Sequence, residues 1–250
     1  MHRMPDSTIP SSYPRLTPVG ESSVLVEYEP EISLEVNRRV RQLASGLQQD
    51  GVPGMVEIVP AYRSLMVSFD ADRVELPVIL TAIEERARRL EDRPLPASRL
   101  FRIPTVYGGE HGPDLARVAE TTGMTQDQVI ELFSSQRYPV YCLGFLCALA
   151  YMGGVPKPLQ MPRLATPRTR LPAGSVGMAN AQAVVLPMDQ PSGFHYLGRT
   201  FVTMYDPKRF PPTPIQAGDF VECPPVSEAE ALKWKGRFLG ECQSDCPANS

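Results

Sequence analysis

The sequence predicts an α+β fold of two domains, a ferredoxin-like α/β sandwich followed by a β-rich barrel or sandwich. The first half of the chain alternates strand-like and helix-like patterns, whereas the second half is a series of short apolar runs separated by glycine and proline. A charged, proline-bearing linker over 91–99 lies between them. We therefore expect domains at residues 13–98 and 99–235, with a flexible tail at 236–250.

The first domain begins with a β-branched run over 22–28, which predicts a strand. An amphipathic helix is expected over 33–50, capped by Ser33 and ended by Gly51. Its apolar residues recur at helical spacing: Val36, Val40, Leu43 and Leu47.

Two further strands are expected over 55–60 and 64–69, joined by the short connector "AYR" and therefore antiparallel. A second helix over 75–90 carries Pro77 in its first turn, where the missing N–H is tolerated. The order strand, helix, strand, strand, helix predicts a ferredoxin-like sandwich whose last strand is not assigned.

The second domain begins with "FRIPTVY", which could form a strand. Two short helices follow, of which the later one starts with a capping box formed by Thr125 and Gln128. From residue 138 onward five apolar and aromatic runs predict strands: "YPVYCLGFL", "GSVGMA", "AVVLP", "FHYLGRTFVTMYD" and "GDFVECPPV".

Composition limits the function. A net charge of −3 and the absence of a long basic run argue against nucleic acid as a partner. No stretch has the length of a membrane span or the apolar core of a signal peptide, so we expect no membrane partner and a cytoplasmic protein. Cys242 and Cys246 lack further ligands at metal-site spacing, so we expect no bound metal and place both in the tail.

Several unusual blocks occur together in one order: "PAYRSLMVSFD", "YGGEHGPDLARVAETTGMTQDQVIELFSS", "YPVYCLGFL", "PRLATPRTRLPAGSVG" and "GRTFVTMYDP". Over residues 20–226 they resemble the family of the 5-oxoprolinase B-type subunit, which also contains allophanate hydrolase subunit 1 and a histidine-kinase inhibitor. The resemblance implies a ferredoxin-like domain followed by a cyclophilin-like β-barrel domain.

The resemblance also implies a carboxyltransferase-like subunit that works with companion subunits to hydrolyse 5-oxoproline at the expense of ATP. The sequence contains no phosphate loop of the G-x-x-x-x-G-K-[ST] kind. We therefore expect no cofactor on this chain alone, and ATP only within such a complex. The expected partners are a companion carboxyltransferase-like subunit, or further copies of this chain, and a small-molecule substrate.

Two segments depart from the family pattern. "GFLCALAYMGG" lacks the usual Pro-Gly-Phe corner and has Cys147, Ala148 and Leu149 in its middle. "ANAQAVVLP" replaces glycine and polar residues by alanine and valine but keeps Gln182. These changes predict a more apolar site on a preserved fold.

The stretch "PRLATPRTRLPAGSVG" places three arginines among prolines that fix the backbone φ angle. Arg163, Arg168 and Arg170 could therefore present guanidinium groups to a carboxylate, or could instead pair with acidic residues such as Asp189. The backbone N–H groups near Ser175 could bind an anion, although a plain hairpin explains this turn equally well.

Other candidate site residues come from residue chemistry. His195 is the only histidine in the β-rich half, and its place in the strand puts it either in solvent or in the barrel as an acid or base. Cys147 could be a nucleophile but is better explained as a buried thiol. Tyr151, Gln182 and Asp189 are candidates for catalytic or polar contacts. The family resemblance adds Arg63, for which a salt bridge between domains is an equal explanation.

Three functions remain open from the sequence. The first is a subunit of an ATP-dependent lactam or amide hydrolase. The second is a stand-alone enzyme of secondary metabolism that binds an apolar substrate in the altered barrel pocket without ATP. The third is a binding module that inhibits a histidine kinase, for which an exposed apolar patch and no deep pocket would be expected.

Overall fold

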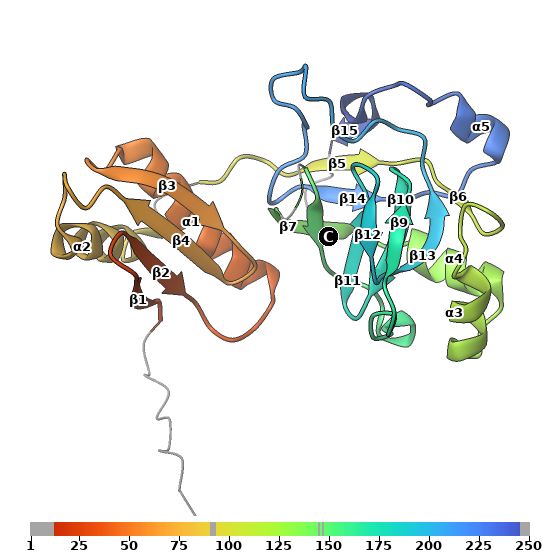
Figure 1. The fold of residues 1–250 in the computed structure, drawn as a ribbon, viewed down its shortest axis with the longest axis horizontal. Helices are drawn as coiled ribbons and strands as arrows, with labels where there is room; N and C mark the ends of the chain where they lie inside the picture. Colours follow the sequence, from red (N-terminus) through yellow and green to blue (C-terminus); the bar gives the residue numbers. More distant parts are fainter. Residues whose placement is uncertain (1–12, 91–93, 145, 147, 246–250) are drawn as a thin grey trace, which may run out of the picture. The chain divides into compact units, whose positions relative to one another are not determined.

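The computed structural model describes residues 13–90, 94–144, 146 and 148–245. The chain divides into two compact units, Met1–Pro96 and Ala97–Ser250, and both contain helices and sheet (Figure 1). The predicted α+β class is therefore confirmed. Within the described ranges, no helix is both long and apolar enough to cross a membrane.

The first unit contains a four-stranded antiparallel sheet in the order β1-β2-β4-β3. The strands are β1 (Arg15–Val19), β2 (Ser23–Glu27), β3 (Met55–Pro60) and β4 (Ser64–Phe69). Alternate residues of β2 and β4, such as Val26 and Val67, are fully buried and share one core with Val40 and Ile83 of the helices. This alternation is what a sheet covered on one face requires.

The helices of the first unit are α1 (Leu34–Asp50) and α2 (Leu76–Ala87). The side chain of Ser33 accepts a hydrogen bond from the Val36 N–H at 3.3 Å, and Gly51 follows the helix with a φ of 60°. The predicted cap and stop of α1 are thus confirmed, and Pro77 lies in the first turn of α2 as expected.

The fourth strand of this sheet is β1, which precedes β2 in the chain and pairs with it at the sheet edge, whereas the strand left unassigned by the sequence was the last one, after the second helix. In a ferredoxin-like order the fourth strand follows the second helix, so the ferredoxin-like topology stays a prediction for this unit. Strand β1 carries Pro18 and is mostly exposed, and it therefore has none of the apolar alternation that signals a strand.

The second unit is built on a curled nine-stranded sheet in the order β15-β5-β14-β7-β8-β11-β10-β13-β6. Neighbouring strands are antiparallel except for β5 and β14, which are parallel. A separate two-stranded sheet pairs β9 with β12. The strands are β5 (Arg99–Arg102), β6 (Val106–Tyr107), β7 (Tyr138–Leu143), β8 (Ala150–Met152), β9 (Arg168–Leu171), β10 (Ser175–Ala179), β11 (Gln182–Val185), β12 (Gln190–Ser192), β13 (His195–Arg199), β14 (Phe220–Glu222) and β15 (Gln243–Asp245).

The two faces of the nine-stranded sheet bury different clusters. Val185 and Leu197 belong to the main core, whereas their chain neighbours Val184 and Tyr196 belong to a smaller cluster. Because successive side chains of a strand point to opposite faces, these clusters lie on opposite sides of β11 and β13. The smaller cluster also contains Leu149, Leu171 and Leu186.

Three α-helices complete the described part of this unit: α3 (Leu115–Thr122), α4 (Gln126–Ser134) and α5 (Glu228–Leu232). The predicted capping box of α4 is confirmed, because Thr125 and Gln128 exchange hydrogen bonds of 2.8 and 3.2 Å. Two 3-10 turns, η2 (Lys157–Leu159) and η3 (Leu239–Cys242), lie in the same unit.

The expectation of a flexible tail over 236–250 is wrong for residues 236–245. Leu239 is fully buried in the main core, Cys242 is buried beside it, and β15 pairs with β5 from Gln243 to Asp245. Two buried side chains and a strand ladder hold this segment. Cys246 lies outside the described residues.

Candidate functional site

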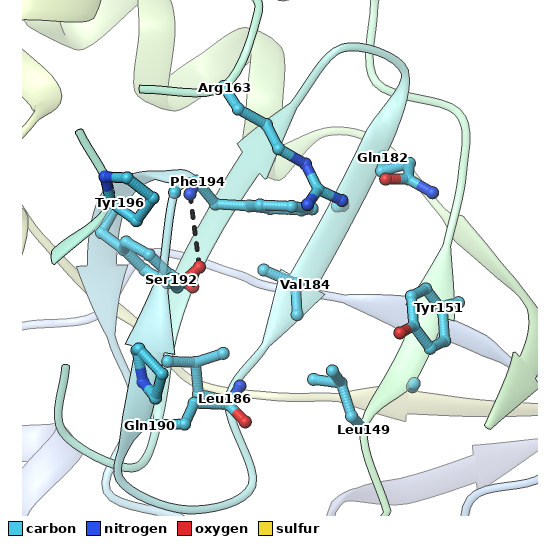
Figure 2. A pocket seen from close by; sticks show the side chains of 15 residues that line it. Leu149, Tyr151, Arg163, Gln182, Val184, Leu186, Gln190, Ser192, Phe194 and Tyr196 are labelled. Carbon is cyan, nitrogen blue, oxygen red and sulfur yellow. Dashed lines mark hydrogen bonds between the residues drawn. The ribbon is translucent and has the colours of Figure 1, made fainter. Parts of the chain in front are cut away.

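A pocket of about 270 Å³ opens beside the smaller apolar cluster of the second unit (Figure 2). Its lining comes from segments 149–151, 182–184 and 190–194, joined by Arg163, Pro167, Leu186 and Tyr196. Strands β8, β11, β12 and β13 therefore position most of the walls. The two segments that depart from the family pattern, around residues 149 and 184, both contribute.

The walls of this pocket are mainly apolar. Leu149, Val184 and Leu186 are buried members of the cluster, and the rings of Phe194 and Tyr196 pack against it. The alternation along β11 sends Val184 toward the pocket and Val185 into the main core. The prediction of a more apolar site agrees with these contacts.

Arg163 supplies the positive charge of the pocket. Its guanidinium lies 4.9 Å from the centre of the Phe194 ring, which is the geometry of a cation–π contact (Figure 2). Among the described residues it has no ion-pair partner. A permanent cation on an apolar wall can attract a carboxylate.

The backbone on both sides of Arg163 is fixed by β13 and the turn before it. His195 Nε2 donates a hydrogen bond of 2.8 Å to the carbonyl of Pro162, and the Leu164 N–H donates one of 2.7 Å to the carbonyl of Gly193. These two bonds bracket Arg163. They hold its Cα in place while its side chain reaches the pocket.

Uncharged polar groups complete the lining. Ser192 Oγ accepts hydrogen bonds from the Tyr196 hydroxyl at 2.8 Å and from the Phe194 N–H at 3.2 Å. Burial raises the pKa of Tyr196 to about 12, and burial also raises the pKa of Tyr151. Both phenols therefore stay neutral at physiological pH. Gln182 and Gln190 add amide groups.

Gln190 has an unusual environment. The residue is 5% exposed, and its Oε1 atom has no hydrogen-bond partner among the described residues. Most buried polar groups in proteins are paired, so an unpaired one points to a missing partner.

Among the predicted site residues that the structure describes, three line this pocket: Tyr151, Arg163 and Gln182. Arg168 instead forms a bidentate ion pair with the buried Asp114, at 2.7 and 2.6 Å. Arg170 forms an exposed pair with Asp189 at 2.7 Å. For Arg168 and Arg170, the alternative of pairing with acidic residues agrees with the structure.

The turn near Ser175 does bind an anionic group, but this group belongs to the chain itself. The Ala173 N–H donates a 2.8 Å hydrogen bond to Asp189 Oδ1, while the Ser175 hydroxyl donates to the Pro172 carbonyl. Asp189 therefore bridges this turn and Arg170, and these contacts lower its pKa. Asp189 and Ser175 do not line the pocket.

His195 is buried, which excludes the solvent-facing alternative: β13 lies inside the sheet and both of its faces are covered. It does not line the pocket, and its described hydrogen bond goes to the Pro162 carbonyl. This position fits a positioning residue better than an acid or base.

Two sequence candidates remain, Arg63 and Cys147. Arg63 belongs to the first unit, where it donates to the Tyr28 carbonyl at 3.1 Å and lies 3.7 Å from Glu27 Oε1. Both of these partners belong to its own unit. Cys147 lies outside the described residues.

One group of possible metal ligands occurs among the described residues. Donor atoms of Glu110, His111 and Glu228 lie within 4.8 Å of one another. His111 packs edge-on against Phe201, both glutamates are exposed, and none of the three residues lines the pocket. Neither glutamate carries a sequence signal that predicts a site.

Sequence reasoning missed Gln190, Ser192 and Phe194 as pocket residues, and Asp114 as the partner of Arg168. The run "DQPSGF" before His195 contains three of them and looks like an ordinary turn. Only the pairing of β12 with β9 brings this run over the apolar cluster.

The second unit thus combines a mixed α+β architecture with a small, mostly apolar pocket whose described lining has one unpaired cation. The family model "Carboxyltransferase domain, subdomain C and D" matches residues 14–215. The chain belongs to this carboxyltransferase-domain family.

Similar proteins support this assignment. The chain is 39% identical over 212 residues to the 5-oxoprolinase B-type subunit of Escherichia coli O157:H7, covering 84% of this chain and 95% of that protein. It is 34% identical over 227 residues to the protein of the same name from Bacillus subtilis (strain 168), covering 87% and 95%.

Among solved structures, TTHA0988 has a TM-score of 0.71 and 32% identity, covering 82% of this chain and 39% of that chain. This chain therefore spans about two fifths of that longer protein.

Proposed function

We propose that this chain is a subunit of an ATP-dependent lactam or amide hydrolase resembling 5-oxoprolinase, and that the pocket beside Arg163 holds the substrate. The identity to the 5-oxoprolinase B-type subunits over nearly the full length of those relatives supports the class of reaction. The pocket supports the proposal that this chain binds the substrate of that reaction.

The observation that carries the proposal is the chemistry of the pocket lining. Its described polar groups are a guanidinium, two amides, hydroxyl groups and backbone. Such groups bind and orient a carboxylate or an amide by charge and hydrogen bonding. The chain would thus hold the lactam while a companion subunit supplies the acid, base and nucleotide groups that open it.

A companion subunit is needed because this chain would bind the substrate but not ATP. The sequence has no phosphate loop, so ATP would be held by another subunit or between subunits. A cytoplasmic location fits such an enzyme. A companion carboxyltransferase-like subunit is our first expectation, with self-association of this chain as the alternative.

The test is reconstitution. The chain is co-expressed with candidate companions encoded beside it, and lactam opening is measured with and without ATP. We expect turnover of a lactam carboxylate only when companions and ATP are both present. Turnover by the purified chain alone would contradict the proposal.

A second function is favoured by the apolar walls. Leu149, Val184 and Leu186 would suit a stand-alone enzyme that binds an apolar substrate without ATP. Omitting ATP in the assay distinguishes the two, because only the stand-alone enzyme keeps its activity. A well-formed pocket makes the kinase-inhibitor function less favoured.

A further inference from the structure

Two polar groups of the pocket lack partners within the described chain. The Arg163 guanidinium lies over Phe194 without an ion pair, and the buried Gln190 Oε1 receives no hydrogen bond. By contrast, Arg168 and Arg170 on the neighbouring strand are both paired with carboxylates. Gln190 Oε1 is one of several buried polar atoms without a hydrogen-bond partner in the described chain, and it is the one of them that lies in the pocket lining.

The absence of a donor at Gln190 has an energetic consequence. A buried acceptor that has left water without gaining a hydrogen bond destabilises the folded protein. A leucine of similar size would avoid this penalty at a wall that is otherwise apolar. The amide is thus best explained by a bound molecule that donates a hydrogen bond to Oε1.

The two groups lie on different sides of the pocket. Figure 2 shows Arg163 and Gln190 toward opposite ends of the view, with Val184 between them. A ligand that pairs with Arg163 and also donates a hydrogen bond to Gln190 must have its anionic group and its hydrogen-bond donor at opposite ends. Apolar surface must lie between these two groups. The volume of about 270 Å³ restricts it to a small molecule.

We propose that the pocket binds a lactam carboxylate whose carboxylate and lactam N–H lie at opposite ends of a flat apolar body. The carboxylate pairs with Arg163, the N–H donates to Gln190 Oε1, and the body packs on Val184. That the ligand is a lactam rests on the proposed function; its charge, donor and apolar body rest on the pocket. In 5-oxoproline the carbon that bears the carboxylate is bonded directly to the lactam nitrogen. Its carboxylate and N–H can therefore reach only one of the two groups, Arg163 or Gln190 Oε1.

The test is calorimetric titration of the full chain with oxindole carrying a carboxylate para to its nitrogen. Three matched ligands are the N-methyl derivative without the donor, the carboxamide without the charge, and 5-oxoproline without the apolar body. We expect the N-methyl compound and the carboxamide each to bind about tenfold more weakly, as loss of one good hydrogen bond or charge contact implies.

The variants assign each preference to a side chain. In Gln190→Leu the preference for N–H over N-methyl should vanish, while the preference for carboxylate over carboxamide remains. In Arg163→Met the preference for carboxylate over carboxamide should vanish, while the preference for N–H over N-methyl remains. Arg170 is exposed outside the pocket, so Arg170→Met should keep both preferences. Unfolding curves of each variant verify that it is folded, and Gln190→Leu should melt no lower than the wild type.

Equal binding of the N–H and N-methyl compounds by the wild type would overturn the proposal, as would tighter binding of 5-oxoproline than of the oxindole. No saturable binding of the oxindole would overturn it as well. Because these titrations use the chain alone, they are independent of the ATP-dependent assay. Failure of that assay with these preferences intact would contradict only the proposed function.

Discussion

Arg168 and Asp114, 54 residues apart in the sequence, form a bidentate ion pair of 2.7 and 2.6 Å. Asp114 is 2% exposed, and its Oδ2 also accepts the N–H of Tyr196 at 2.8 Å. The pair therefore connects β9, the start of α3 and the strand that carries a pocket wall. Arg168, which the sequence offered as a candidate for binding a carboxylate ligand, therefore has a structural role.

This pair predicts a contrast between two arginines of one strand. Arg168→Ala leaves the buried Asp114 carboxylate without its cation, and removing one member of a buried pair destabilises by about 3 to 5 kcal/mol. Arg170→Ala removes an exposed pair, which is worth at most about 1 kcal/mol. Urea unfolding of the two variants measures both values, and equal losses would refute the assignment.

A second prediction concerns His195, which fixes the carbonyl next to Arg163. His195→Leu should weaken binding of a carboxylate ligand by about tenfold, because a loosened backbone no longer positions the guanidinium. In a double-mutant cycle with Arg163→Met, the two losses should not add.

The cycle also separates this role from acid–base chemistry. If His195 acted as an acid or base, His195→Leu would abolish turnover in the assembled enzyme and leave ligand affinity unchanged. We expect the opposite pattern, with KM raised more than kcat is lowered.

The third prediction tests the C-terminal segment. Leu239 is fully buried in the main core, whereas Leu232 on α5 is 46% exposed. Leu239→Ala should lower the free energy of unfolding by about 2 to 5 kcal/mol through the cavity it leaves. Leu232→Ala is the matched control and should change it by less than about 1 kcal/mol. A flexible tail would make both substitutions harmless.

A fourth prediction concerns alkaline pH. Burial raises the pKa of Tyr196 to about 12, above its value in the unfolded chain. A raised folded-state pKa contributes stability that is complete below about pH 10 and is lost as the pH rises toward about 12. Unfolding free energies across this range should therefore fall, by up to about 3 kcal/mol for this residue.

The control is Tyr196→Phe, which removes the titrating hydroxyl. Its stability should decline less steeply than that of the wild type over the same pH range. A parallel decline in both proteins would show that Tyr196 contributes nothing to it.

The sequence was sufficient to predict features that depend on residues close together in the chain. The cap formed by Ser33 and the capping box of Thr125 and Gln128 join residues three apart, and all were predicted. Strand β1 was missed because its exposed edge position requires no apolar alternation. The segment around Leu239 was assigned to the tail, and only the fold shows its core contacts.

The candidate site was less predictable because it depends on contacts between residues far apart in the chain. Three arginines share one proline-rich stretch, and nothing local distinguishes Arg163 from Arg168 and Arg170. Their partners Asp114 and Asp189 come from distant segments that the topology brings close. The unpaired Oε1 of Gln190 likewise depends on tertiary structure and has no sequence signal.

The central claim is that the Arg163 pocket holds the substrate of an ATP-dependent lactam hydrolase. The most direct measurement is ATP-dependent lactam opening by the complete complex, assembled with the wild-type chain, with Arg163→Met or with Arg170→Met. We predict that Arg163→Met raises KM by about tenfold or more, as expected for loss of a charge-assisted contact, while Arg170→Met matches the wild type. Equal kinetics for all three complexes, or turnover that persists without ATP, would contradict this account.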